Sequence, residues 1–307
     1  MSLKYVDRRG MDNVKWDGMW SKYGSEDLLP MWIADMDFEC ADCIREALSD
    51  YAKNVPLGYA MPPDDYYDAF IDWEKKYHGY EVKREWMCFS PGVVSAFYWG
   101  VLMLTKPGDG VITLTPVYYP MLNAVKDNDR KLIMCDLFRN EMDYFIDFER
   151  FERDIVENDV KLFIFCSPAN PVGRIWAASE IRKLMEICKK HGVYVISDEI
   201  HQDFEWEDHK HIPTATLGDY DSFLITMTSA SKSFNIAAIQ NSIVIIPDDE
   251  LRARYKDFQS RIHVGSGNAF GYIATAAAYR NGREWLEEVK AQVEKDAQEA
   301  RKRLKNL

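Results

Sequence analysis

From residue 86 onward, short apolar runs alternate with segments of helical periodicity, and this alternation constrains the fold of the 307-residue chain most strongly. The apolar runs lie at residues 86–90, 111–114, 131–135, 161–166, 193–197, 223–227 and 242–246. Helical patterns lie between several of them, at residues 93–104, 179–191 and 248–262. Alternating strands and helices of this kind predict an α/β fold, a mostly parallel sheet sandwiched by helices.

The charge and hydropathy of the chain exclude several classes of partner. The net charge of −12 argues against a nucleic-acid or anionic-membrane partner, because phosphate groups are bound through surplus Lys and Arg. No apolar run of the sequence reaches membrane-spanning length, and the N-terminus, MSLKYVDRRG, is too polar for a secretion signal. We therefore expect a cytoplasmic protein with a small-molecule ligand.

The first 80 residues read as an irregular arm followed by helices. Residues 1–30 are rich in Trp, Asp and Gly, and helical patterns follow at 41–53 and 64–78. The segment 31–39, MWIADMDFE, ends in acids that are most simply solvated. Cys40 and Cys43 form a lone C-x-x-C without a second pair or a His at zinc spacing, so we expect a structural role for them.

Lys232 is the first candidate catalytic residue. It lies in a Ser-rich turn, TSASKSF, between two apolar runs, where we expect a loop between buried strands. An amine held partly out of water loses solvation of its charged form, so its pKa falls and it becomes a usable nucleophile. The chemistry that fits is a Schiff base with an aldehyde; the alternative is a surface lysine in a turn.

Two other predicted strands end at residues suited to an anion or a flat ring. Gly92, Val93 and Val94 follow the first strand at a helix N-terminus, where free amides and the helix dipole favour a phosphate. Tyr118 follows the second strand, where its ring could stack on a planar ligand or simply pack. In open α/β sheets, ligands bind beyond the carboxyl ends of the strands.

Two further strand ends carry polar side chains. Asn170 lies in a turn after residues 161–166, with an amide free to donate to an oxygen. Asp198 directly follows the run 193–197, at the expected end of a buried strand, and His201 follows three residues later. A carboxylate buried at that position is expected to face a cation, because an unpaired one would be costly.

Taken together, these segments resemble a known family. SPANPVGRIW, VISDEIH and TSASKSFNIAAI are similar to signatures of fold-type I pyridoxal-5′-phosphate (PLP) enzymes of the aminotransferase class I/II superfamily. WIADMDF, PVYYP, NPVGR and SDEIH resemble more narrowly its MalY/PatB branch, the cystathionine β-lyase-like carbon–sulfur lyases. The resemblance runs in one order from about residue 31 to residue 280.

The resemblance implies a role for each candidate around PLP. Lys232 would form the Schiff base with the cofactor, and Asp198 would pair with its pyridine nitrogen. Asn170, with His201 nearby, would bind the 3′ oxygen, and Tyr118 would stack on the ring. The remaining implied cofactor ligands would hold the phosphate: Gly92, Val93, Val94, Ser229 and Ser231.

The resemblance also implies a homodimer with shared sites. Tyr59 would reach the phosphate of the neighbouring subunit, whereas Ala34 and Asn170 would contact the substrate. The structural alternatives are a core aromatic for Tyr59 and a loop histidine with satisfied hydrogen bonds for His201.

Two departures from the family pattern set further expectations. Gln240 stands where many relatives carry a phosphate-binding Arg, so PLP affinity could be lower. The Arg that usually binds the substrate carboxylate comes from a C-terminal small domain, and Arg174 and Arg261 are poor substitutes. We expect residues 1–44 to form the arm and part of the small domain, 45–282 the PLP-binding large domain, and 283–307 the start of the helix leading to a small domain that is missing or incomplete. The 307-residue chain is then expected to be poorly stable and nearly inactive.

The implied activity is α,β-elimination. A PLP-dependent carbon–sulfur β-lyase would convert L-cystathionine, L-cysteine or a related S-substituted cysteine to a thiol, pyruvate and ammonia. Two alternatives remain open: an aminotransferase of the same fold, and a regulatory or binding protein that retains PLP.

Overall fold

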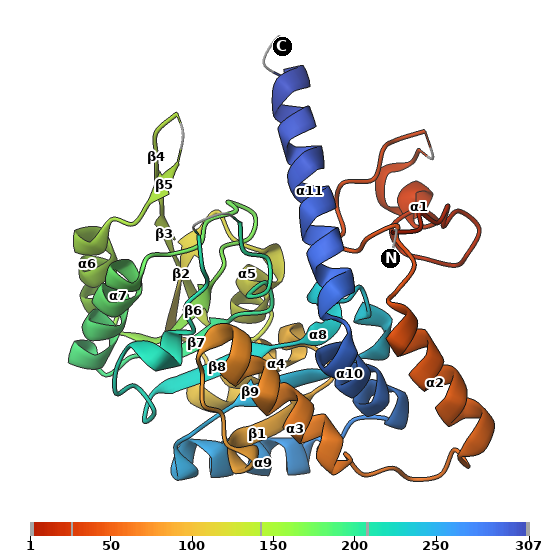
Figure 1. Cartoon of the computed structure of the whole chain (residues 1–307). Coiled ribbons are helices and arrows are strands. Elements are labelled where there is room, and N and C mark those ends of the chain that lie inside the picture. Colours follow the sequence, from red (N-terminus) through yellow and green to blue (C-terminus); the bar gives the residue numbers. More distant parts are fainter. Residues whose placement is uncertain (1–2, 26, 142, 207–208, 305–307) are drawn as a thin grey trace.

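The computed structural model describes residues 3–25, 27–141, 143–206 and 209–304. Within these residues the chain forms a seven-stranded sheet flanked by helices and a separate two-stranded hairpin (Figure 1). The strands of the sheet are β1 (Met87–Ser90), β2 (Gly110–Thr115), β3 (Lys131–Asp136), β6 (Val160–Cys166), β7 (Tyr194–Asp198), β8 (Leu224–Thr228) and β9 (Ser242–Ile245). The hairpin pairs β4 (Phe138–Arg139) with β5 (Tyr144–Phe145).

The sheet is mostly parallel, as the sequence predicts. Its strand order is β1-β9-β8-β7-β6-β2-β3, and the pairs among β3, β2, β6, β7 and β8 are all parallel. β9 runs antiparallel to both of its neighbours, β1 and β8. β1 therefore points the same way as the parallel strands, and the carboxyl ends of every strand but β9 lie at one edge of the sheet.

The helices cover both faces of this sheet. The α-helices are α1 (Met19–Tyr23), α2 (Asp42–Asn54), α3 (Asp64–Trp73), α4 (Val93–Leu104), α5 (Tyr119–Lys126), α6 (Phe148–Glu157), α7 (Ala178–His191), α8 (Ala230–Ser233), α9 (Asp249–Arg261), α10 (Ala269–Asn281) and α11 (Arg283–Leu304). Shorter elements are the π-helix η1 (Glu74–His78) and the 3₁₀ turns η2 (Arg84–Trp86), η3 (Thr214–Leu217) and η4 (Ala237–Ile239).

Alternation along the buried strands builds a core on each face. Successive strand residues point to opposite sides, so Val111 packs with α4, α5 and α9, whereas its neighbour Ile112 packs with α6 and α7. Over β1 and β9 the second face is covered by α2, α3 and α10. Because both faces are buried, the strands read in the sequence as continuous apolar runs.

The predicted elements agree with the structure except at a few points. All seven predicted strands are present, and the helical pattern at 64–78 becomes α3 followed by the π-helix η1. Lys232 lies in the single turn α8 and not in a loop. The patterns described above do not predict α6, α10 or the hairpin.

The last helix leaves the layered body. α11 begins against α10, where Leu286 and Val289 are buried, and then runs away from the sheet (Figure 1). Among the described residues, no helix combines the length and the apolar character needed to span a membrane.

Candidate active site

A cavity of about 630 Å³ opens at the carboxyl edge of the sheet, a volume typical of small-molecule sites. The loops that follow β1, β2, β6, β7 and β8 all contribute to its wall. It is lined by these predicted site residues: Ala34, Gly92, Val93, Val94, Tyr118, Asn170, Asp198, His201, Ser231 and Lys232. The fold thus brings together segments spread over almost 200 residues of sequence.

Lys232 projects from α8, the turn that follows β8. Its Nζ donates a hydrogen bond to the Ala34 carbonyl at 3.1 Å. Burial lowers the pKa of the Lys232 amine, while the carboxylates of Asp35 and Asp198 act in the opposite direction. The site therefore holds an amine that loses its proton more readily than an exposed lysine does.

Asp198 is the last residue of β7 and is only 3% exposed. Burial raises the pKa of its carboxyl to about 7, although a hydrogen bond from the Ile200 backbone N–H at 3.2 Å opposes the rise. Among the described residues Asp198 forms no ion pair. A buried carboxylate of this kind is suited to a ligand that brings a cationic nitrogen.

The start of α4 offers donors for an anion. Gly92 is the N-cap of α4, a helix of 12 residues, and no side chain caps that end. The first amides of the helix, at Val93 and Val94, therefore have no partner within the helix and lie at the positive end of its dipole. Gly92, Val93 and Val94 all line the cavity.

Three further predicted residues border the same space. Tyr118 is half-buried at the start of α5, and burial raises the pKa of its hydroxyl. Burial, with a smaller effect of Lys232, lowers the pKa of His201 to about 4, so its ring is neutral at pH 7. Within the described part of the chain the His201 ring forms no hydrogen bond, so the structure does not support a loop histidine with satisfied hydrogen bonds.

Asn170 is held by the turn after β6. Its backbone N–H donates to Cys166 Sγ at 3.4 Å, and the same turn is closed by a bridge between Ala169 and Arg174. Arg174 is fully engaged there, because it donates to both Glu180 oxygens at 3.0 and 3.1 Å. These contacts agree with the expectation that Arg174 is a poor substitute for the Arg that binds the substrate carboxylate.

Two predicted residues do not line the cavity. Tyr59 is fully exposed in the loop between α2 and α3, so the alternative of a core aromatic is wrong. The Ser229 hydroxyl donates its proton to the Asn241 carbonyl at 2.6 Å and accepts from the Ser231 N–H at 3.1 Å. The geometry therefore gives Ser229 a capping role in α8 and does not support the predicted contact with a phosphate.

Gln240 and Arg261, the residues at the two departures from the family pattern, lie in different places relative to the cavity. Gln240 lines the cavity, in the left-handed conformation at φ 53°. Arg261 is exposed at the end of α9 and pairs with Asp257 at 2.8 Å, away from the cavity wall.

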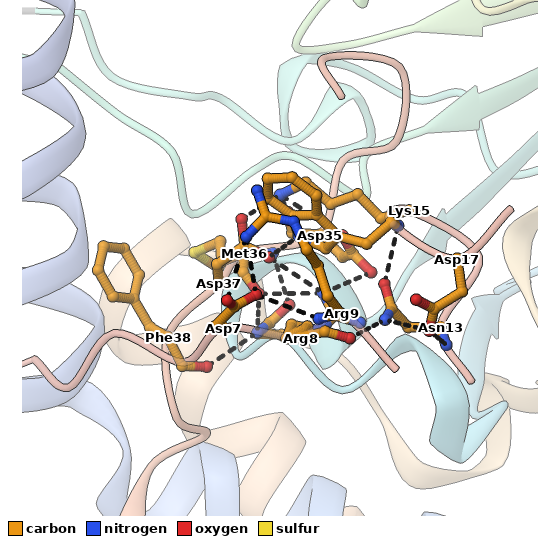
Figure 2. A network of polar contacts seen from close by, with 12 residues as sticks. Asp7, Arg8, Arg9, Asn13, Lys15, Asp17, Asp35, Met36, Asp37 and Phe38 are labelled. Carbon is orange, nitrogen blue, oxygen red and sulfur yellow. Dashed lines mark hydrogen bonds and ion pairs between the residues drawn. The ribbon is translucent and has the colours of Figure 1, made fainter. Parts of the chain in front are cut away.

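The sequence patterns missed most of the contribution of the N-terminal arm. Val14, Met31, Trp32 and Ile33 form an apolar part of the wall. Figure 2 shows a polar network of the same arm, in which Asp35 and Asp37 pair with Arg8 and Lys15. The expectation that these acids are solvated is therefore wrong, and no local pattern pairs residues about 20 positions apart.

The donor set of the cavity defines the ligand it can take. Its lining includes the first amides of a helix, a buried carboxylate that forms no ion pair among the described residues, and an amine of lowered pKa. These groups fit a flat ring with a cationic nitrogen, an anionic group and an aldehyde.

Comparisons with known proteins agree with this geometry. The model of the family "Aminotransferase class I and II" matches residues 27–307. The chain is 41% identical to "Cystathionine beta-lyase PatB" of Bacillus subtilis over 97% of its own length and 77% of the relative. It is 32% identical to "Protein MalY" of Escherichia coli, covering 92% of this chain and 73% of that protein. A PLP-bound putative aminotransferase from Clostridium difficile superposes with a TM-score of 0.94 at 41% identity, covering 97% of this chain and 77% of that one.

Proposed function

Because the chain belongs to the aminotransferase class I and II family, we propose that it is a PLP-dependent carbon–sulfur β-lyase. Its substrate is L-cystathionine, L-cysteine or another S-substituted cysteine. The reaction removes the Cα proton, breaks the Cβ–S bond with its electron pair leaving on sulfur, and adds water to give a thiol, pyruvate and ammonia. The 41% identity to a cystathionine β-lyase across nearly the whole chain favours this activity over others of the family.

The single observation that carries the proposal is the pair of Asp198 and Lys232 in one cavity. Asp198 is buried and forms no ion pair among the described residues, and Lys232 is an amine of lowered pKa. Bound PLP supplies an aldehyde for the amine and a protonated ring nitrogen that draws electrons away from the substrate Cα. Asp198 keeps the proton on that nitrogen by an ion pair.

The other residues bind and orient. The amides of Val93 and Val94 at the start of α4 hold the phosphate, with Ser231 nearby. Asn170 donates to the ring oxygen, the neutral His201 lies beside it, and Tyr118 covers the ring face.

Lys232 is the base of the reaction. When it is not bonded to the cofactor, its Nζ would accept the Cα proton of the substrate, since burial lowers its pKa. Ala34, whose carbonyl accepts from Nζ, would contact the substrate there.

Assembly and domain division are part of the same proposal. A homodimer in which Tyr59 reaches the phosphate of the neighbouring subunit is supported by the full exposure of this side chain. We propose that residues 45–282 form a PLP-binding large domain, residues 1–44 the arm with part of a small domain, and residues 283–307 the start of the helix leading to the small domain.

The test is product analysis with L-cystathionine. Pyruvate, ammonia and thiol formed in equal amounts by PLP-loaded protein, and abolished in Lys232→Ala, support the lyase. A 2-oxo acid that retains the sulfur, formed without ammonia, would instead identify an aminotransferase. Bound PLP without turnover of any S-substituted cysteine would contradict both activities.

A further inference from the structure

The arm carries a network of charged side chains close in sequence to the wall residues Val14 and Ala34 (Figure 2). Asp37 accepts from Lys15 Nζ at 2.8 Å and from Trp16 Nε1 at 3.0 Å, and Asp35 pairs with Arg8 at 2.9 Å. The four charged side chains are only 11–23% exposed. Although burial acts to raise it, the bonds from Lys15 and Trp16 lower the pKa of Asp37.

The same segment is bonded to the lysine turn. Asn235, three residues after Lys232, accepts from the Met36 N–H at 2.9 Å and donates to the carbonyls of Met36 and Phe38 at 2.9 and 3.3 Å. Met36 lies between the two acids, and its carbonyl also accepts from Arg8 Nη1 at 3.3 Å, so the network and Asn235 hold the same short segment of backbone. The Ala34 carbonyl, two residues earlier, accepts from Lys232 Nζ.

Lys15 joins this strip to the apolar wall. Its Nζ also donates to the Asp35 carbonyl at 3.0 Å, and its own carbonyl accepts from Trp32 Nε1 at 3.2 Å. Its neighbour Val14 and Trp32 both line the cavity. The Lys15 side chain thus contacts the backbone next to Ala34, and the Lys15 main chain contacts the apolar wall.

Asp35 adds an electrostatic link to the site. One of its oxygens, Oδ1, is buried, has no hydrogen-bond partner among the described residues and lies 3.9 Å from Lys15 Nζ. An incompletely paired buried carboxylate acts on charges nearby, and Asp35 is the leading group that opposes the fall in the pKa of Lys232. Arg8 and Lys15 thus partly neutralise the Asp35 carboxylate, whose charge also acts on Lys232.

From these contacts we propose that Lys15 and Asp37 are positioning residues of the reaction: they fix residues 31–38 on the Lys232 turn, so that the Ala34 carbonyl aims Nζ and the arm closes the cavity wall. This inference rests on the proposed lyase function for its role in turnover. The positioning itself is a property of the chain alone.

The experiment compares Asp37→Asn, Lys15→Met and the double variant with a matched control, Asp7→Asn. Asp7 belongs to the same arm, but its pair with Arg9 is about 60% exposed, and exposed pairs contribute little to stability. The first measurement is amide hydrogen exchange of residues 31–38 in the full chain with PLP. The second is kcat/KM for L-cystathionine.

We expect Asp37→Asn and Lys15→Met to speed amide exchange over residues 31–38 and to leave the exchange of α4 unchanged. Both variants should lower kcat/KM by about tenfold or more, since small misplacements at a reacting centre are costly. The double variant should lose no more than the worse single one, because the two residues act as one pair. Asp7→Asn should match the unaltered protein in both measurements.

Unchanged exchange over residues 31–38 in Asp37→Asn would overturn the positioning role, and so would faster exchange with kcat/KM within about twofold of the unaltered protein. Absence of turnover in the unaltered protein refutes the proposed lyase and not the positioning, which the exchange measurement decides on its own.

Discussion

Replacing Asp198 with Asn is expected to stabilise the PLP-free protein and to weaken the PLP-loaded one. Asp198 is 3% exposed, and burial raises the pKa of its carboxyl from 3.8 to about 7. A carboxyl whose pKa is raised by folding destabilises the folded state at pH values where the group is ionised. Asn has nearly the same shape, can still accept from the Ile200 N–H and carries no charge.

The magnitude follows from the rise in pKa. Each pKa unit corresponds to about 1.4 kcal/mol, so ionised Asp198 lowers the free energy of unfolding by about 4 kcal/mol at pH values above both pKa values. The penalty is absent below pH 3.8, grows between pH 3.8 and about 7, and is constant above. For a chain of this size the change at pH 8 corresponds to roughly 8 °C in Tm.

The assay is thermal and urea unfolding of both proteins at pH 4.5 and pH 8, with and without PLP. Without PLP, we expect the free energy of unfolding of Asp198→Asn to exceed that of the wild type by about 4 kcal/mol at pH 8 and by much less at pH 4.5. With PLP the order should reverse, because the ring nitrogen supplies the cation that ionised Asp198 needs.

A PLP-free Asp198→Asn protein no more stable than wild type at pH 8 would refute the reasoning. It would mean that the carboxyl is solvated or already paired in the empty site. A variant stabilised equally at both pH values would show that the gain has another origin than charge.

The remaining predictions concern the structure around the site. Asp203 and Glu74 raise the pKa of His78 to about 9 despite burial, so charged His78 stabilises the fold fully below pH 6.5 and loses that effect as the pH rises through 9. The difference in free energy of unfolding between wild type and His78→Gln, measured in urea, should therefore shrink by about 3 kcal/mol between pH 6.5 and 9.5. An unchanged difference would contradict the charged pair of His78 and Asp203. Gly100→Ala places a methyl group against Ile196 Cδ1 beneath α4, so the free energy of unfolding should fall by about 1–3 kcal/mol, and a neutral effect would show that Ile196 can move aside. Gln240→Arg adds a charged donor to the cavity wall and should tighten PLP binding by roughly tenfold in a spectroscopic titration, whereas unchanged affinity would place the phosphate elsewhere.

The layered fold was predictable because its strands are buried on both faces. Runs such as 161–166 and 223–227 are continuous in apolar residues, and the turns after them carry Asn170 and Lys232. Since parallel strands share one carboxyl edge, side chains predicted separately at those turns meet in one cavity. The positions of Asp198 and of Gly92 to Val94 follow from the same rule.

The arm and the details of the lysine turn were not predictable in this way. Asp35 and Asp37 read as solvated acids, because their partners Arg8 and Lys15 lie more than 20 residues away with no periodicity to connect them. Ser229 has the residue type and place of a phosphate ligand, but its hydroxyl proton is used to bond the Asn241 carbonyl. Such pairings arise from tertiary packing and leave no local signal in the sequence.

Peptide mapping after borohydride reduction tests the central claim most directly. Reduction fixes the pyridoxyl group on the lysine that carries it and blocks tryptic cleavage there. Between Lys210 and Arg252 the sequence has one tryptic site, Lys232, so the reduced protein should yield a single labelled peptide of residues 211–252. Unlabelled residues 211–232 and 233–252, with the pyridoxyl group on another lysine or on none, would contradict the assignment of Lys232 and the mechanism built on it.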